Sequence, residues 1–177
     1  MPKTKEAVFL NIPYDPQFTR LYLAYITALS AISFLPQATL GITGNRRLDR
    51  IPRTPRFNMP FELGLAVAWA QANPRHKWFV FESVRRRLNK SLSDLDGTDP
   101  YIHGGTVRGV MREVCNAFVS RGTQPTVPQM MKMYRELRRD CPGILKNAGA
   151  QSIFTARVFS DLCVAAAGLR SKYLGSD

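Results

Sequence analysis

One glutamate near the start of an apolar helix is the side chain best placed for chemistry in this sequence. Residues Pro60 to Gln71 are predicted to form a helix with small and apolar side chains at helical spacing, and Glu62 lies near its beginning. The positive end of a helix dipole favours a carboxylate, and the free N–H groups of a first turn hold anions. Such a glutamate can orient a sugar hydroxyl, attack an anomeric carbon or stabilise an oxocarbenium ion. The alternative, which spacing alone favours, is that Glu62 caps its own helix or pairs with an arginine.

The segment after the first predicted strand carries a second set of candidates. Residues Ala7 to Ile12 form a continuous apolar run around Asn11, which is typical of a strand covered on both faces of a parallel sheet. Ligands of open parallel sheets bind beyond the carboxyl ends of the strands. Asn11 can hydrogen-bond a base or a ribose from that position, and Tyr14 can stack on a base. A loop held by Pro13 and Pro16 is equally consistent with these residues.

Metal binding and thiol chemistry are not indicated. Asp94, Asp96 and Asp99 suggest a cation loop, but their spacing lacks the ligands and the terminal glutamate of an EF-hand, so solvated turn aspartates are the better interpretation. His103 precedes two glycines and can face a ligand at the start of the next helix, although a structural histidine is more common. The three cysteines have no zinc spacing, which favours a reducing, cytoplasmic protein.

The charge balance favours anionic partners. The 177 residues hold 25 Lys and Arg against 13 Asp and Glu, giving a formal net charge of +12. Arginines gather at 46–56, at 85–87 and at Arg135, Arg138 and Arg139, the last three on one helical face. These side chains can contact phosphates, but no zinc finger or RNA-recognition signature accompanies them, and a solvated basic face is slightly favoured.

Several nucleotide-binding and catalytic motifs are absent. The sequence holds no triphosphate-binding loop, no dinucleotide fingerprint and no nucleophile elbow, so no bound cofactor is predicted. The first six residues lack a signal-peptide pattern, and no uninterrupted apolar run reaches the roughly 18 to 20 residues that span a bilayer. We therefore expect no membrane partner.

The periodicities predict an α/β protein. Its expected strands are 7–12, 35–42 and 77–82, and its expected helices are 16–33, 60–71, 106–119, 126–139 and 152–173. The stretch from Thr43 to Pro60 shows no secure element. This order predicts a mostly parallel sheet of four or five strands in a nucleotide-binding-like domain over residues 1–122, with a C-terminal helical extension over 123–177 packed on it.

Two segments together resemble a known superfamily. They are Val8-Phe9-Leu10-Asn11-Ile12-Pro13-Tyr14-Asp15 and Arg56-Phe57-Asn58-Met59-Pro60-Phe61-Glu62-Leu63-Gly64, and the likeness extends over about residues 7 to 120. The chain resembles an uncharacterised bacterial branch of the superfamily that unites nucleoside 2-deoxyribosyltransferases and Toll/interleukin-1-receptor-like domains. The resemblance implies a flavodoxin-like, doubly wound sheet. It also implies that Glu62 matches the glutamate that attacks the N-glycosidic carbon in the deoxyribosyltransferases and has a comparable part in Toll-like NAD-cleaving enzymes.

The same resemblance implies ligand contacts around that glutamate. Asn11, Pro13 and Tyr14 match the nucleotide-side loop after the first strand. The other ligand-binding candidates are Arg56, Asn58, Met59 and His103, and an arginine of the 46–56 stretch is expected to meet phosphate. Relatives usually carry another strand, ending in an aspartate, before the glutamate helix. Here the interval from 43 to 60 holds Asp49 as its only acid, so either the element is deleted or a flexible piece is absent from the sequence. A true deletion would leave Glu62 without its usual partner and would favour binding over catalysis.

Three functions are consistent with the sequence. The first is an enzyme that cleaves or transfers at the N-glycosidic bond of a nucleoside or nucleotide, with NAD as a possible substrate. The second is a nucleotide-sensing module of bacterial defence or signalling without turnover, and the third is a protein that binds nucleic acid through its basic surface. A homo-oligomer is also expected, with the alanine-rich helix Ser152 to Tyr173 burying against a copy of itself.

Overall fold

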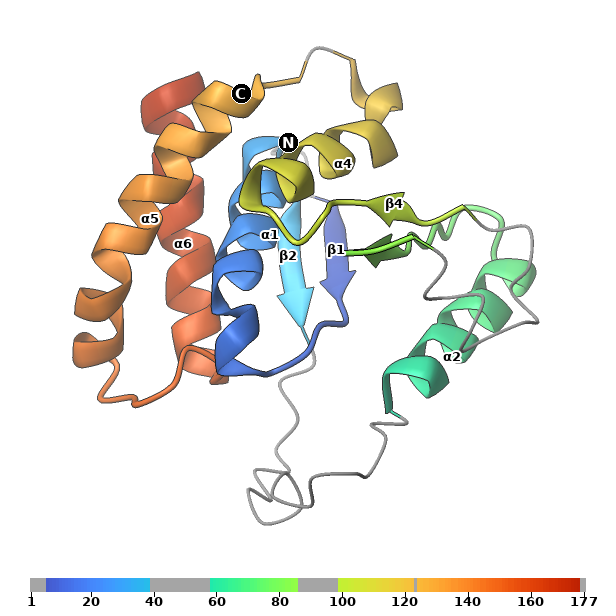
Figure 1. Cartoon of the computed structure of the whole chain (residues 1–177), viewed down its shortest axis with the longest axis horizontal. Coiled ribbons are helices and arrows are strands. Elements are labelled where there is room, and N and C mark those ends of the chain that lie inside the picture. The colour runs from blue at the N-terminus through green and yellow to red at the C-terminus, as the bar shows by residue number, and fades with distance from the viewer. Residues whose placement is uncertain (1–5, 39–57, 86–98, 123, 176–177) are drawn as a thin grey trace, which may run out of the picture.

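A central helix organises the molecule. The computed structural model describes residues 6–38, 58–85, 99–122 and 124–175 (Figure 1). Helix α1, Thr19–Ala31, follows the 3-10 turn η1, Pro16–Phe18, and all of its side chains from Leu21 onward are buried. The Thr27 hydroxyl donates to the Leu23 carbonyl at 2.7 Å, which satisfies this polar group inside the core. Because α1 carries no charge after its first turn, it can be covered on every side.

The strands form two short parallel pairs. Strand β1, Ala7–Leu10, pairs with β2, Leu35–Ala38, in the register Ala7 opposite Leu35, and α1 is the crossover between them. Strand β3, Phe81–Glu82, pairs with β4, Tyr101–Ile102. The mixed α/β class is thus confirmed, while the described residues show two separate two-stranded sheets in place of one sheet of four or five strands.

The two sheets are nevertheless covered by one helix. The Tyr25 ring of α1 lies edge-on to Phe81 of β3 at 5.6 Å between centroids, and edge-on to His103 just after β4 at 6.3 Å. Strand β3 is shorter than predicted: Lys77 to Val80 are not part of a strand, although the Val80 carbonyl accepts a hydrogen bond from the Tyr101 N–H at 2.8 Å. The predicted continuation of the second strand beyond Ala38 lies outside those residues.

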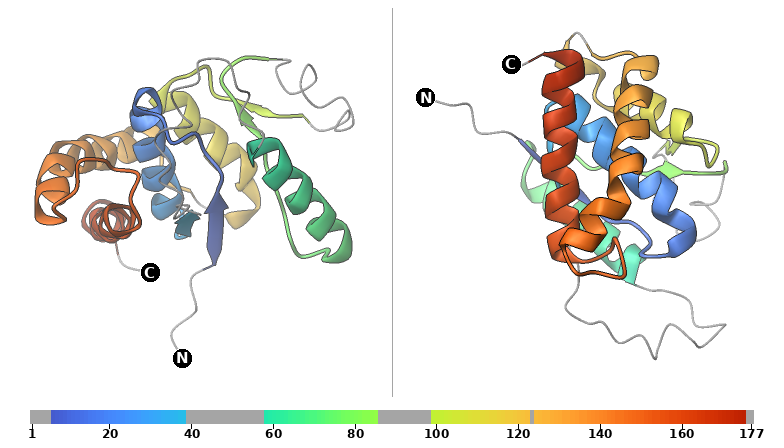
Figure 2. Two further views of the ribbon diagram at one scale, coloured as in Figure 1. Left: turned by 90° about the horizontal axis from the view of Figure 1, so that it is seen from below. Right: turned by 90° about the vertical axis from the view of Figure 1, so that its left-hand side faces the viewer.

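Three C-terminal helices enclose α1 from the other sides (Figure 2). They are α4, Val107–Ala117, α5, Val127–Asn147, and α6, Ala156–Leu174. The side chains that meet in the core and are almost completely buried include Tyr22, Leu23, Ile26, Leu29, Val110, Met111, Val114, Met130, Met133, Leu137, Val158 and Leu162. The apolar face of α6 is therefore covered within the chain, where it packs on α1 and α5.

Threonine caps begin each of these three helices. Thr106, Thr126 and Thr155 each accept a hydrogen bond from a backbone N–H three residues later, and Thr126 forms a capping box with Gln129. The segment before each of these helices therefore ends in the residue that caps the helix N-terminus.

Helix α5 is longer than its sequence pattern predicted. The prediction ended at Arg139, but the helix continues through Pro142 to Asn147. Buried Cys141 and the half-buried Ile144 and Leu145 pack on the core, which compensates for the proline. Pro142 is exposed, so water can satisfy the carbonyl that its missing N–H leaves unbonded.

Helix α2, Asn58–Ala72, stands on the opposite side of the β1–β2 pair from α5 and α6 (Figures 1 and 2). The Trp69 carbonyl near its end accepts hydrogen bonds from the backbone N–H and the side-chain amide of Asn73, at 2.9 and 3.0 Å. No helix in the described part of the chain is both long enough and apolar enough to cross a bilayer.

Candidate functional site

The negative charge of Glu62 acts on the Tyr14 hydroxyl. Tyr14 lies in the loop after β1, and Glu62 comes from α2, which follows much later in the chain. Burial raises the pKa of the Tyr14 hydroxyl, and the negative charge of Glu62 raises it further. Two candidates predicted from separate motifs therefore interact electrostatically beyond the carboxyl end of a parallel strand.

The position of Glu62 within its helix differs from the prediction. The expected start at Pro60 put Glu62 in the first turn, whereas the helix begins at Asn58 and its first turn holds no acidic residue. Glu62 thus lies beyond the free N–H groups, so it neither caps the helix nor gains the full effect of the dipole. Among the described residues Glu62 forms no ion pair, and its side chain is half-buried.

An aromatic cluster supports Tyr14 from the side of the C-terminal helices. The ring of Phe154, in the connection between α5 and α6, lies edge-on to Tyr14 at 5.8 Å and 5.1 Å from Tyr22. Phe159 of α6 completes the cluster, 6.1 Å from Tyr22. The last third of the chain therefore helps to fix Tyr14. No pattern in the sequence linked Phe154 to the loop after β1.

Tyr22 adds a second phenol beside Tyr14. Burial raises its pKa strongly, with further contributions from Cys163 and Tyr14, so its hydroxyl stays protonated. That hydroxyl is buried and accepts or donates no hydrogen bond within the described residues. A buried donor without a partner is costly, and no pattern in the sequence pointed to this one at Tyr22.

The remaining predicted site residues lie in the loop after β1 and at the start of α2. Asn11 and Pro13 are half-buried on either side of the buried Ile12, which anchors the loop after β1. Asn58 and Met59 open α2, but their side chains lie outside the description, as does all of Arg56.

His103 belongs to the core between β4 and α4. Its side chain is 4% exposed, its ring packs against Tyr25, and its Nδ1 accepts the Gly105 N–H at 3.2 Å. Its carbonyl accepts hydrogen bonds from both the backbone N–H and the hydroxyl of Thr106. None of its described interactions involves Glu62 or Tyr14, so the structure favours the structural role that the sequence left open.

The buried histidine predicts a loss of stability in acid. Burial lowers the pKa of His103, and Glu113 opposes this only in part. The imidazole of His103 binds a proton more readily in the unfolded chain than in the folded one. The contribution of neutral His103 to the free energy of unfolding is therefore complete above pH 6.5 and is lost as the pH falls below that value. We expect His103→Asn, which preserves an acceptor for Gly105, to flatten the dependence of the melting temperature on pH between about 7 and 5. The exposed His76 provides the control, and a His76→Asn variant with the same flattening would contradict the prediction.

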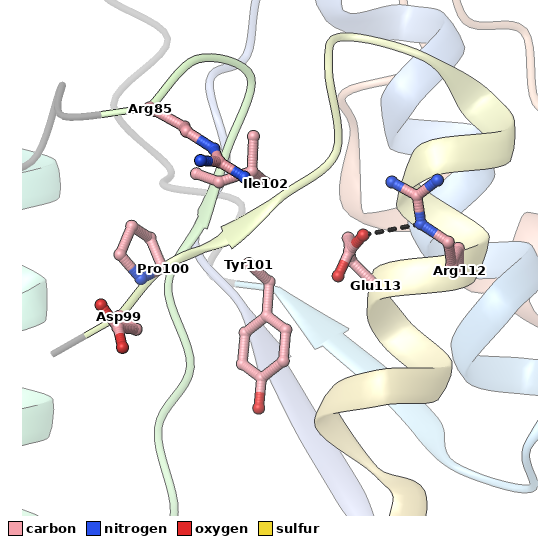
Figure 3. A pocket seen from close by; sticks show the side chains of 7 residues that line it. All are labelled: Arg85, Asp99, Pro100, Tyr101, Ile102, Arg112 and Glu113. Carbon is pink, nitrogen blue, oxygen red and sulfur yellow. Dashed lines mark hydrogen bonds and ion pairs between the residues drawn. The ribbon is translucent and has the colours of Figure 1, made fainter.

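Two open hollows are lined by neither Glu62 nor Tyr14. One, of about 450 Å³, borders β4 and the middle of α4, where Arg112 donates to Glu113 at 2.8 Å (Figure 3). The other, of about 390 Å³, lies between β2 and α6 and is lined by Phe9, Leu35, Phe159 and Cys163 among others. Burial raises the pKa of the Cys163 thiol to about 12, which makes it unreactive. In the described residues no three His, Cys, Asp or Glu side chains gather as metal ligands.

Comparison of this chain with family models, curated proteins and solved structures finds no match in any of the three.

Proposed function

We propose that this chain cleaves or transfers at the N-glycosidic bond of a nucleoside or nucleotide, NAD included, with Glu62 as the nucleophile. The observation that carries the proposal is that the charge of Glu62, in α2, raises the pKa of Tyr14 in the loop that follows the carboxyl end of β1. A carboxylate without an ion partner among the described residues, and a protonated phenol within reach of its charge, can supply a nucleophile and a hydrogen-bond donor to one ligand.

The chemistry assigns one role to each group. A Glu62 oxygen attacks the anomeric carbon, the bond to the base nitrogen breaks, and its electron pair leaves with the base, which takes up a proton. Water or a second base then attacks the anomeric carbon of the glycosyl ester and restores the carboxylate. The Tyr14 hydroxyl, kept protonated by its raised pKa, donates a hydrogen bond toward the carboxylate or a sugar oxygen. Asn11, beside it after β1, orients the ribose.

The proposal includes a doubly wound, flavodoxin-like arrangement of the strands. Its support is that both described strand pairs are parallel, that α1 joins β1 to β2, and that Tyr25 of α1 contacts the β3–β4 side as well. In such an arrangement the loop after β1 lies at the ligand-binding edge.

Product analysis tests the proposed activity. The pure protein is incubated with a mixed pool of nucleosides, deoxynucleotides and NAD, and free bases are measured by mass spectrometry. Release of one base identifies the substrate class and supports the proposal. If the protein retains one pool member after desalting and forms no product, the site is a nucleotide sensor. Neither product nor retention overturns both of these functions.

A basic face on α5 favours nucleic-acid binding as a second candidate function. Lys132, Arg135, Arg138 and Lys146 are exposed, and none of them is ion-paired within the described residues. Arg139 differs because it pairs with Glu136 at 3.3 Å and with Asp140 at 3.2 Å. Unpaired cations on one face of a long helix can follow a phosphate backbone without reading its sequence.

This second function predicts a measurable change in salt dependence. Replacing Lys132, Arg135 and Arg138 by glutamine is expected to weaken binding to random duplex DNA and to reduce the slope of log affinity against log salt by about 0.9 for each phosphate that these side chains no longer neutralise. Fluorescence anisotropy over a salt series measures both quantities. The control replaces three exposed arginines of other helices, Arg20, Arg108 and Arg157. An equal decrease in the two triple variants would show that net charge, rather than the α5 face, governs binding.

A further inference from the structure

Helix α2 exposes an apolar ridge that nothing in the described chain covers. Phe61, Leu65 and Trp69 recur every four residues, so they lie on one helical face, and their side chains are 67%, 55% and 60% exposed. Gly64, Ala68 and Ala72 are exposed beside them and form a shallow strip of small residues along the ridge. The opposite side of α2 is half-buried, through Leu63, Ala66, Val67 and Ala70 among others.

Such a helix is unusual at a free surface. Its apolar residues are spread over all sides, a pattern typical of a helix that is buried all round. The three ridge side chains alone expose roughly 350 Å² per copy, which approaches the largest apolar patches of ordinary monomers. Because the opposite side of α2 is already half-buried, the ridge is the face of this helix whose apolar surface remains exposed to water.

We propose that the partner is a second copy of this chain, packed ridge against ridge through α2. The charge distribution supports this occupant. The chain carries a net charge of +12, so two copies repel each other over most of their surfaces. The 15 residues of α2 include no cation, and Glu62 is their only charged side chain. Two copies therefore meet through this face without opposing cations, and its only charge, Glu62, lies at the edge of the ridge, three residues before Leu65 and seven before Trp69.

The α2 face also has a shape that can pack against the same face of a second copy. In a two-fold contact, the large side chains of one α2 pack into the strip formed by Gly64 and Ala68 on the other, as ridges pack into grooves. Two copies of the ridge and the small residues beside it bury on the order of 1,000 Å² in total, the lower limit for a specific interface. We therefore expect a dimer that dissociates on dilution rather than an obligate one.

Mass measurements of two variant pairs test the interface. Wild-type protein is expected to change from dimer to monomer by sedimentation or light scattering between about 100 and about 1 µM. Leu65→Glu and Trp69→Glu are each expected to weaken the dimer by about 100-fold or more, because each places two desolvated carboxylates in the contact. Val119→Glu and Val164→Glu are the matched controls, since these side chains are equally exposed, at 74% and 70%, but lie outside α2. Both controls are expected to remain dimeric.

Fluorescence provides a measurement that needs no disruptive substitution. The chain has two tryptophans, so Trp78→Phe leaves Trp69 as the only reporter. Its emission is expected to shift to shorter wavelength as the concentration rises, because dimerisation buries it. A constant monomer mass over the whole concentration range, or dimers that persist in both α2 variants, would overturn the proposal. Neither readout depends on turnover, so failure of the interface and failure of the proposed activity are distinguishable.

Discussion

Glu62→Gln is expected to abolish the release of free base while leaving the fold intact. An amide oxygen is a poor nucleophile, so we expect turnover to fall at least ~10³-fold. Glutamine has the shape of glutamate, and Glu62 forms no ion pair among the described residues whose loss would destabilise the helix. The measurement is base release under saturating substrate, with Asp140→Asn on the exposed side of α5 as a control that removes a carboxylate elsewhere.

The same variant tests the geometry without reference to activity. Because the charge of Glu62 contributes to the raised pKa of Tyr14, the Tyr14 pKa should fall in Glu62→Gln while its elevation by burial remains. Ultraviolet titration of the tyrosines, with Tyr14→Phe identifying the signal, measures this change. Normal turnover in Glu62→Gln would refute the nucleophile assignment. A large loss of thermal stability, in a protein whose wild type shows no turnover, would make Glu62 a structural residue.

Gly109→Ala is expected to cause the largest loss of stability among single alanine substitutions of the glycines that the structure describes. A Cβ at Gly109 would lie 1.9 Å from the carbonyl oxygen of His103 and 2.8 Å from the Thr106 hydroxyl, and the nearest of these atoms belongs to the backbone. The start of α4 must therefore move away from the end of β4, disrupting the Thr106 cap and the packing of His103. We expect a loss of about 3 kcal/mol in the free energy of unfolding, the upper end for overpacking.

Gly168→Ala is the matched control. Gly168 lies within α6, and a Cβ there would meet no atom within 4 Å. Alanine is a better helix former than glycine, so this variant should gain roughly 0.5–1 kcal/mol. Urea denaturation of both variants measures the difference. A Gly109→Ala protein as stable as the wild type would mean that α4 adjusts without cost and that the close approach is not required.

Part of the candidate site could be recognised before any tertiary contact was known. The apolar run before Asn11 and the prolines after it placed a loop at the carboxyl end of a strand, and the structure has that loop after β1. Glu62 was identifiable as a lone charge in an apolar helix. Both inferences concern neighbours in the chain, for which residue types and spacing are sufficient.

The rest of the site depended on residues far apart in sequence. No local pattern indicated that Phe154 and Tyr22 pack around Tyr14, or that the buried Tyr22 hydroxyl lies beside it. The buried position of His103 likewise follows from the approach of α1 to the β3–β4 pair. Such contacts are chosen by the packing of whole elements, which spacing within one element does not encode.

The sequence by itself determined the α/β class, the order of the helices and most of their starts. The threonine caps act within three residues, and the apolar periodicity of α1 reports its own burial. Only the tertiary structure decided how far α5 runs past Pro142, which strands pair, and that the charge of Glu62 acts on Tyr14. The physical reason is that capping and periodicity are local energies, whereas strand pairing, helix extension and electrostatic contact are selected by burial between segments distant in the chain.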